Sequence, residues 1–136
     1  MRRWLLLLGG GLIALLLIIA GASVLTTKLQ ERHEKQTTVS FINKVLADNA
    51  QASYTMFSSS AQKAQSEDQW AATVQKLSKF FKGKSPQFQT LTTTKTTVIA
   101  HYAITGNDGN YIMIVTLTKT KAGWQVLNFT SRLQTS

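Results

Sequence analysis

The sequence predicts an α+β fold, with an N-terminal transmembrane helix followed by three helices packed on an antiparallel sheet of about four strands. Three observations lead to this prediction. The segment Trp4–Leu25 contains no charged residue. Apolar residues then recur at helical spacing as far as Pro86, and beyond it they alternate with polar residues as strands require. A chain of 136 residues leaves room for one small domain after the hydrophobic segment.

The hydrophobic segment has two interpretations. As a helix, the 22 residues Trp4–Leu25 span roughly 33 Å, which is enough to cross the hydrocarbon core of a bilayer. As a cleaved secretory signal, Arg2 and Arg3 form the basic region, Leu5–Ile19 the apolar region, and Ala20–Ala22 the cleavage site. We favour the uncleaved anchor, because the apolar run continues through Leu25 and is long for a signal peptide.

Both interpretations carry the rest of the chain across a membrane. The cations on the two sides of the segment do not fix its orientation, but the signal-like N-terminus predicts a single-pass protein of the cell membrane with an extracytoplasmic C-terminal domain. Cleavage after Ala22 would give a secreted protein instead. The expected organisation is an anchor over residues 1–27, a linker or helical neck over residues 28–36, and an α+β domain over residues 37–136.

The first two helices follow the neck. Charges alternate in sign from Lys28 to Lys35, including Glu31 and Glu34, which predicts a solvated helical neck. From about Thr37 an apolar stripe predicts the first helix; its members are Phe41, Ile42, Val45 and Leu46. The second helix is expected to carry Ala50, Tyr54 and Phe57 on one face.

The third helix has the clearest signals. Ser66 and Gln69 have the spacing of a capping box, and Glu67 and Asp68 place acidic side chains in the first turn, where the helix dipole favours them. One stripe then predicts the buried face, formed by Trp70, Val74, Leu77 and Phe81. Gly83 and Pro86 end the helix.

The remaining chain predicts a meander of strands. The first and weakest strand covers Gln87–Thr94. In the second strand one face consists of Val98, Ala100, Tyr102 and Ile104, and in the third of Tyr111, Met113, Val115 and Leu117. Gly106–Gly109 forms the turn between them. Lys121–Gly123 makes the next tight connection, and the last strand begins at Trp124.

The net charge of +9 favours anionic surroundings such as lipid headgroups or wall polymers. It does not come from the N-terminus alone, because 13 basic residues still oppose six acidic ones without Arg2 and Arg3. Cysteine is absent, which excludes disulfides, thiolate metal sites and a cysteine nucleophile.

The order of helices and hairpin-linked strands, with the ending Gly123-Trp124-Gln125-Val126-Leu127-Asn128-Phe129, resembles the nuclear-transport-factor-two-like (cystatin-like roll) superfamily, in particular its small membrane-anchored bacterial members of unknown function. The resemblance covers roughly Thr37–Leu133. It implies a curved sheet that wraps the helices, a pocket between them, and homodimerisation through the open face of the sheet. The short strand that many members place between their second and third helices is not evident here.

Residues for catalysis, metal binding or a cofactor are not predicted. Enzymes of the superfamily use Asp, Glu, His or Tyr on strands, but the only carboxylate from Gln87 to Ser131 is Asp108, in a predicted turn. His101 is the only histidine of the strands and points away from the face of Tyr102. His33 and His101 have no metal-ligand spacing, and no glycine-rich phosphate loop is present.

Two sets of residues are candidates for binding. The first could line a pocket or form the core, two possibilities that the sequence does not separate; it comprises Tyr54, Phe57, Trp70, Tyr102, Tyr111 and Trp124. The second surrounds the third helix and is either a solvated face or a contact for an anionic surface; it comprises Lys63, Lys76, Lys79, Lys82 and Lys84. Nucleic acid is not expected, because no arginine or aromatic ladder accompanies these lysines.

These observations favour a non-enzymatic, membrane-anchored module that binds a protein partner or ligand, or assembles with a second copy, at the extracytoplasmic face. The bilayer itself is the first partner, through residues 4–25. One alternative is a component of a type IV secretion or conjugation complex in the inner membrane, which resembles this layout of one anchor and one roll. Another is a small isomerase or hydrolase that uses His101 or Tyr102.

Overall fold

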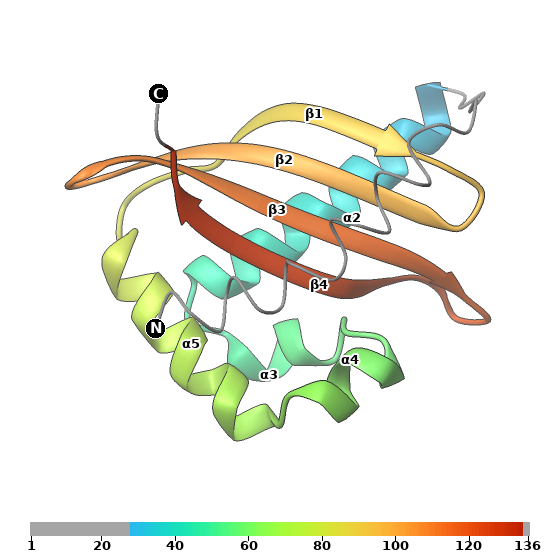
Figure 1. The fold of residues 1–136 in the computed structure, drawn as a ribbon, viewed down its shortest axis with the longest axis horizontal. Helices are drawn as coiled ribbons and strands as arrows, with labels where there is room; N and C mark the ends of the chain where they lie inside the picture. Colours follow the sequence, from blue (N-terminus) through green and yellow to red (C-terminus); the bar gives the residue numbers. More distant parts are fainter. Residues whose placement is uncertain (1–27, 135–136) are drawn as a thin grey trace.

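The computed structural model of the protein describes residues 28–134, with side chains from Arg32 onward. The helices form one layer against one face of a four-stranded sheet (Figure 1). Their bounds are α2 Lys28–Leu46, α3 Ala50–Tyr54, α4 Ser59–Ala64 and α5 Glu67–Phe80. The strands are β1 Gln87–Thr93, β2 Thr97–Gly106, β3 Gly109–Thr120 and β4 Gly123–Leu133.

The α+β class and the four antiparallel strands are confirmed. The sheet has the order β1-β2-β3-β4, and each strand pairs antiparallel with the next. The predicted transmembrane helix lies outside the described residues. Within residues 28–134, no helix is both long enough and apolar enough to cross a membrane.

Helix α2 lies against the sheet and supplies much of the core. Phe41, Ile42 and Val45 are fully buried, as their helical spacing predicted. The helix continues without a break from the neck into this stripe. The expectation of a solvated neck is wrong at Glu34, whose side chain is also fully buried. Glu34 is buried because it stands seven residues, about two helical turns, before Phe41 and therefore lies on the same side of the helix.

The chain between α2 and α5 differs from the expected single helix. Asn49 caps α3 by accepting a hydrogen bond from the Ala52 amide at 3.2 Å, but α3 ends at Tyr54. Phe57 then forms an isolated parallel bridge with Val126 in β4. This one-residue pairing lies between α3 and α4, and no longer strand forms in this part of the described chain.

Helix α4 was not predicted. Ser58 caps it, accepting a hydrogen bond from the Ala61 amide at 3.3 Å. None of its own residues is buried, so its polar sequence carries no apolar stripe that would reveal a helix. The structure therefore has four helices in residues 28–134 where three were expected.

Helix α5 matches its prediction closely. Ser66 and Gln69 form both hydrogen bonds of the capping box, at 3.2 and 3.1 Å. The stripe from Trp70 to Phe81 is buried, as expected for the face that meets the sheet. After the helix, Gly83 adopts a φ of +76°, a left-handed conformation that favours glycine.

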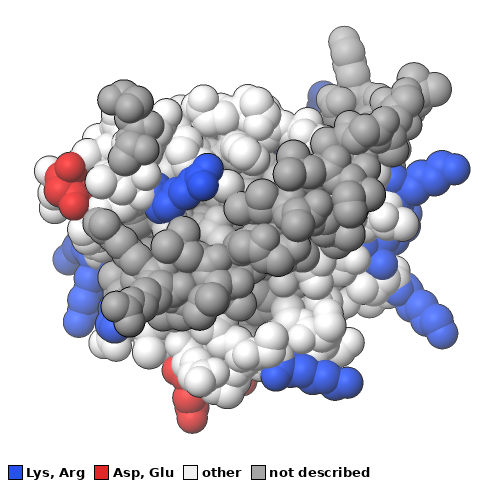
Figure 2. All heavy atoms as spheres, viewed as in Figure 1, with Lys and Arg blue, Asp and Glu red and all other residues white. Residues whose placement is uncertain are grey.

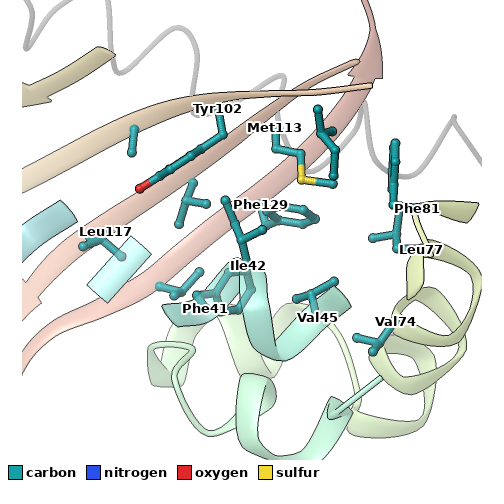
Figure 3. Close-up of a cluster of buried hydrophobic side chains, with 14 of the residues drawn as sticks. Phe41, Ile42, Val45, Val74, Leu77, Phe81, Tyr102, Met113, Leu117 and Phe129 are labelled. Carbon is teal, nitrogen blue, oxygen red and sulfur yellow. The ribbon is translucent and has the colours of Figure 1, made fainter. Parts of the chain in front are cut away.

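The core fills the space between helices and sheet. Figure 3 shows α2 side chains pointing toward Phe129 and Met113, with Val74, Leu77 and Phe81 of α5 beside them. The register confirms the predicted inner face of the central strands, because Ala100 lies opposite Val115 and Tyr102 opposite Met113. Register shifts occur in β1 between Phe88 and Thr90 and at the β3–β4 pairing between Thr116 and Leu117.

Candidate functional site

The six aromatic residues proposed to line a pocket do not form one group. Tyr54, Phe57 and Trp70 come together, with ring centroids of Phe57 and Trp70 only 4.9 Å apart and an edge-to-face angle of 88°. Phe41 and Phe129 complete this first cluster, at 5.8 and 6.1 Å from the Trp70 ring. Such geometry is the favourable arrangement for aromatic rings in a packed core.

The other three aromatic residues lie apart from this cluster and from one another. Tyr111 packs against Phe80 and Phe81 at the end of α5, with centroid distances of 5.3 and 5.2 Å. Tyr102 contacts Phe88 of β1 at 5.7 Å. Trp124 lies near the β3–β4 hairpin, and the Lys119 ammonium nitrogen stands over its ring, 5.5 Å from the ring centroid.

The polar atoms of the first cluster are used within the protein. The Trp70 indole N–H donates to the hydroxyl of Ser53 at 2.8 Å, and both side chains are buried. The Tyr54 hydroxyl donates to the carbonyls of Gln62 and Gln65 at 3.1 and 2.8 Å. These bonds hold α3 against α5 and against the chain that follows α4.

The lysines proposed for an anionic contact are all exposed. Lys63 belongs to the last turn of α4, near the start of α5, where Glu67 and Asp68 stand. Lys76 and Lys79 lie in the second half of α5, and Lys82 and Lys84 follow its end. Four of the five therefore gather around the C-terminus of α5, which is the end of a helix dipole that favours cations.

A polar cluster inside the domain was missed by sequence analysis. Glu34 and Thr38 of α2 lie one turn apart and face the sheet. The Thr93 hydroxyl donates to Glu34 Oε2 at 2.7 Å, and the hydroxyls of Thr38 and Tyr102 share a hydrogen bond of 2.7 Å. All four side chains are buried. The signal was present in the sequence, because residues 34, 38, 41 and 45 follow a single helical stripe.

The phenol of Tyr102 remains protonated at neutral pH. Burial raises the pKa of Tyr102 above its ordinary value of 10.0, and the hydrogen bond with Thr38 offsets part of this effect. Its hydroxyl also reaches the Lys35 carbonyl at 3.3 Å. Figure 3 shows its ring extending from β2 into the interior. Glu34 and Tyr102 thus lie on facing elements, and carboxyl and phenol groups are both among the side chains that can transfer protons.

His101 lies outside this cluster, on the opposite face of β2. It pairs in register with Ile114 and is only partly buried. Burial lowers the pKa of His101 below its ordinary value of 6.5, and the charge of Arg132 lowers it further. Within the described residues, no group of three His, Cys, Asp or Glu side chains could hold a metal ion.

Solved structures with the same fold share little sequence with this chain. A domain of unknown function with a cystatin-like fold from Nostoc punctiforme matches with a TM-score of 0.61 at 14% identity, covering 82% of this chain and 81% of that one. A nuclear-transport-factor-two-like protein with a cystatin-like fold from Novosphingobium aromaticivorans matches with a TM-score of 0.52 at 14% identity, covering 78% and 85%.

A candidate scytalone dehydratase from the same organism matches with a TM-score of 0.52 at 12% identity, covering 79% and 85%. No protein-family model and no curated protein matches the sequence. At these identities the similarity lies in the fold. The chain has the cystatin-like roll fold of nuclear-transport-factor-two-like proteins, as its helix order and its last strand predicted.

Proposed function

We propose that the protein is a membrane-anchored, extracytoplasmic binding or assembly module without enzymatic activity. The uncharged segment Trp4–Leu25 supports the anchor, and the signal-like character of the N-terminus supports the orientation. In this proposal the roll domain presents its outer surface to a protein partner or to a second copy. The interior serves to hold that surface in shape.

The observation that carries the proposal is the packing of the first aromatic cluster. A pocket for a small molecule requires roughly 300–1,000 Å³ lined by apolar side chains. Trp70 is 1% exposed and touches Phe41, Phe57 and Phe129, so these rings fill the space around Trp70 between the helices and the sheet. The hydrogen bond from Trp70 to Ser53 further fixes the ring in place.

Intact mass and membrane fractionation of the protein expressed from its full-length gene test the anchor. Full-length mass in the membrane fraction, resistant to carbonate extraction, is the expected result. A mass beginning at Ser23 in the soluble extracytoplasmic fraction would replace the anchor with a secreted domain. Fusion of alkaline phosphatase to the C-terminus tests the orientation, because that enzyme becomes active after export. Crosslinking in intact membranes then identifies the partner.

A second candidate function is acid–base catalysis, and one observation favours it. Glu34 is a fully buried carboxyl group one helical turn from Thr38, which is hydrogen-bonded to the phenol of Tyr102. Buried titratable groups with a shifted pKa, as Tyr102 has, are more frequent at active sites than elsewhere. One structural neighbour is named as a candidate scytalone dehydratase, so its fold is shared with a protein assigned to such chemistry.

Scytalone itself is a suitable probe for this second function. Dehydration by the wild-type protein that disappears in both Glu34→Gln and Tyr102→Phe, at unchanged thermal stability, would establish catalysis and overturn the non-enzymatic proposal. Equal background rates for the wild type and both variants would exclude this substrate. The His101→Gln variant is the matched control, because His101 lies on the other face of the sheet.

A further inference from the structure

A cationic surface forms at the end of the domain where α2 begins. We define the hairpin-end surface as Arg32 of α2, Lys95 of the β1–β2 turn, Lys119 at the end of β3 and Lys121 of the β3–β4 turn; all four side chains are exposed. These residues are far apart in the sequence, and sequence analysis grouped none of them. Their proximity follows from the way that two hairpins and one helix end at the same edge of the fold.

Hydrogen bonds and strand pairing bring the elements that carry this surface together. The amide of Lys119 donates to the carbonyl of Thr96 at 3.0 Å, which joins the end of β3 to the turn that holds Lys95. Lys121 occupies the turn that follows, where Thr120 pairs with Gly123. Arg32 lies two residues before Glu34, which accepts the hydrogen bond from Thr93 at the end of β1.

Apart from Glu31 and the buried Glu34, which flank Arg32 in α2, the acidic residues lie elsewhere on the described domain. Asp48 follows the opposite end of α2, and Asp108 is in the β2–β3 turn at the opposite end of the sheet. Glu67 and Asp68 start α5 in the helix layer. In Figure 2, blue side chains project at the right, where Figure 1 places the two hairpins, and the red side chains of this view lie at the left and the bottom. Lys28 and Glu31, in the first turn of α2, contribute one charge of each sign.

The hairpin-end surface lies at the end of the domain that follows the hydrophobic segment, which points to lipid headgroups as its partner. Thr26 and Thr27 alone separate Leu25, the end of the hydrophobic segment, from α2. Two residues span at most about 7 Å, so a bilayer that holds residues 4–25 lies next to the start of α2. The same end of the domain then faces the lipid headgroups. Cations close to an anionic bilayer are attracted by its negative surface potential, an effect that salt screens.

We propose that the hairpin-end surface docks the domain on anionic phospholipid headgroups of the bilayer that anchors it. This inference rests on the anchor of the proposed function and adds to it a fixed orientation of the domain, with the β2–β3 turn and the end of α5 directed away from the membrane. Trp124 lies beneath Lys119 in this surface, and tryptophan is favoured at the boundary between lipid and water.

The absence of cysteine makes the test direct, because an introduced cysteine is unique. Ala122→Cys places a fluorophore in the β3–β4 turn, and Asn107→Cys places it in the β2–β3 turn; both positions are exposed. The labelled full-length protein is reconstituted into vesicles of phosphatidylcholine, with or without phosphatidylglycerol, that carry a headgroup-attached quencher. Flotation through a density gradient reports membrane attachment independently of quenching.

The expected result is flotation with both vesicles, and quenching at position 122 that increases with phosphatidylglycerol and is lost in high salt. Quenching at position 107 is expected to stay low. The triple variant Lys95→Glu, Lys119→Glu, Lys121→Glu should lose the increase at position 122. The matched control Lys76→Glu, Lys79→Glu, Lys82→Glu, with the same change of charge around α5, should keep it. Circular dichroism and thermal unfolding verify that both variants are folded.

The remaining outcomes separate this inference from the proposed function. Flotation with both vesicles, but equal quenching at the two positions or loss of the increase in the α5 control, would overturn the docking surface and leave the anchor. Flotation restricted to vesicles with phosphatidylglycerol, abolished by the hairpin triple variant, would support the surface and overturn the anchor. Flotation with neither vesicle would overturn both.

Discussion

The hydroxyl of Thr93 in β1 donates a 2.7 Å hydrogen bond to the carboxyl group of Glu34 in α2, across 59 residues of sequence. Both side chains are buried, so this bond ties the beginning of the long helix to the end of an edge strand. It also fixes the position of the charged neck relative to the sheet. A buried carboxyl group depends on such donors, because removing it from water is costly unless hydrogen bonds replace the hydration.

The Thr93→Val substitution should therefore destabilise the domain. Valine keeps the shape of threonine but donates no hydrogen bond, and the loss of a hydrogen-bond partner of a buried polar group costs about 1–3 kcal/mol. Urea unfolding followed by circular dichroism measures the change in the free energy of unfolding. Thr93→Ser is the control, since it keeps the hydroxyl and loses one methyl group, worth about 1 kcal/mol. A Thr93→Val variant as stable as the wild type would mean that the bond contributes nothing.

The Ser53→Ala substitution should also destabilise the domain. It leaves the buried indole N–H of Trp70 without its acceptor, at a cost of about 1–3 kcal/mol. Ser78→Ala is a matched control, because Ser78 bonds only to its own helix on an exposed surface. In a Trp70→Phe background the cost of Ser53→Ala should fall, since the donor is gone. A cost that persists there would assign the role of Ser53 to its bonds with the α3 backbone.

Stability should decrease as the pH falls below the ordinary pKa of histidine. The folded protein holds the pKa of His101 below 6.5, by burial first and by Arg132 second, so the unfolded chain binds a proton more readily. The resulting stabilisation is complete above pH 6.5 and is lost as the pH falls through the folded pKa. Thermal unfolding from pH 7.5 to 5 measures this dependence. His101→Gln should flatten it, and Arg132→Gln should reduce it in part; unchanged profiles would contradict the assignment.

The Gly83→Ala substitution should lower stability by about 1–2 kcal/mol, the cost of a left-handed backbone for a residue with a side chain. A Cβ atom at this position would meet nothing within 4 Å, so strain at φ +76° is the only source of the cost. The midpoint of urea unfolding measures it. Gly83→Asn should cost less, because asparagine tolerates this conformation better than alanine. An alanine variant as stable as the wild type would show that the chain relaxes after α5.

The short-range signals in the sequence determined much of the fold. The capping box at Ser66 and the stripe from Trp70 to Phe81 define α5 within fifteen or so residues, and alternation in β2 and β3 assigns the inner face of the sheet. The turns at Gly106 and Gly123 then leave each strand next to its sequence neighbour. Such signals succeed because the interactions that cause them lie within a few residues along the chain.

Tertiary structure decided what these signals leave open. Glu34 appears as one more charge in an alternating neck until the helix is placed on the sheet, where its periodicity directs it inward. Phe57 belongs to no predicted element, because its bridge with Val126 depends on a partner 69 residues away. The separation of the aromatic residues into a central cluster and outlying contacts likewise depends on partners that are distant in the sequence.

The hairpin-end surface shows most clearly which properties the sequence determined and which the tertiary structure decided. The sequence determined that the protein is basic and that a hydrophobic segment precedes α2. Tertiary structure decided that Arg32, Lys95, Lys119 and Lys121 share one edge, because the register of two hairpins and the packing of α2 set which turns meet. Composition fixes how much charge a chain carries, but the long-range contacts that place this charge form only when the chain has folded.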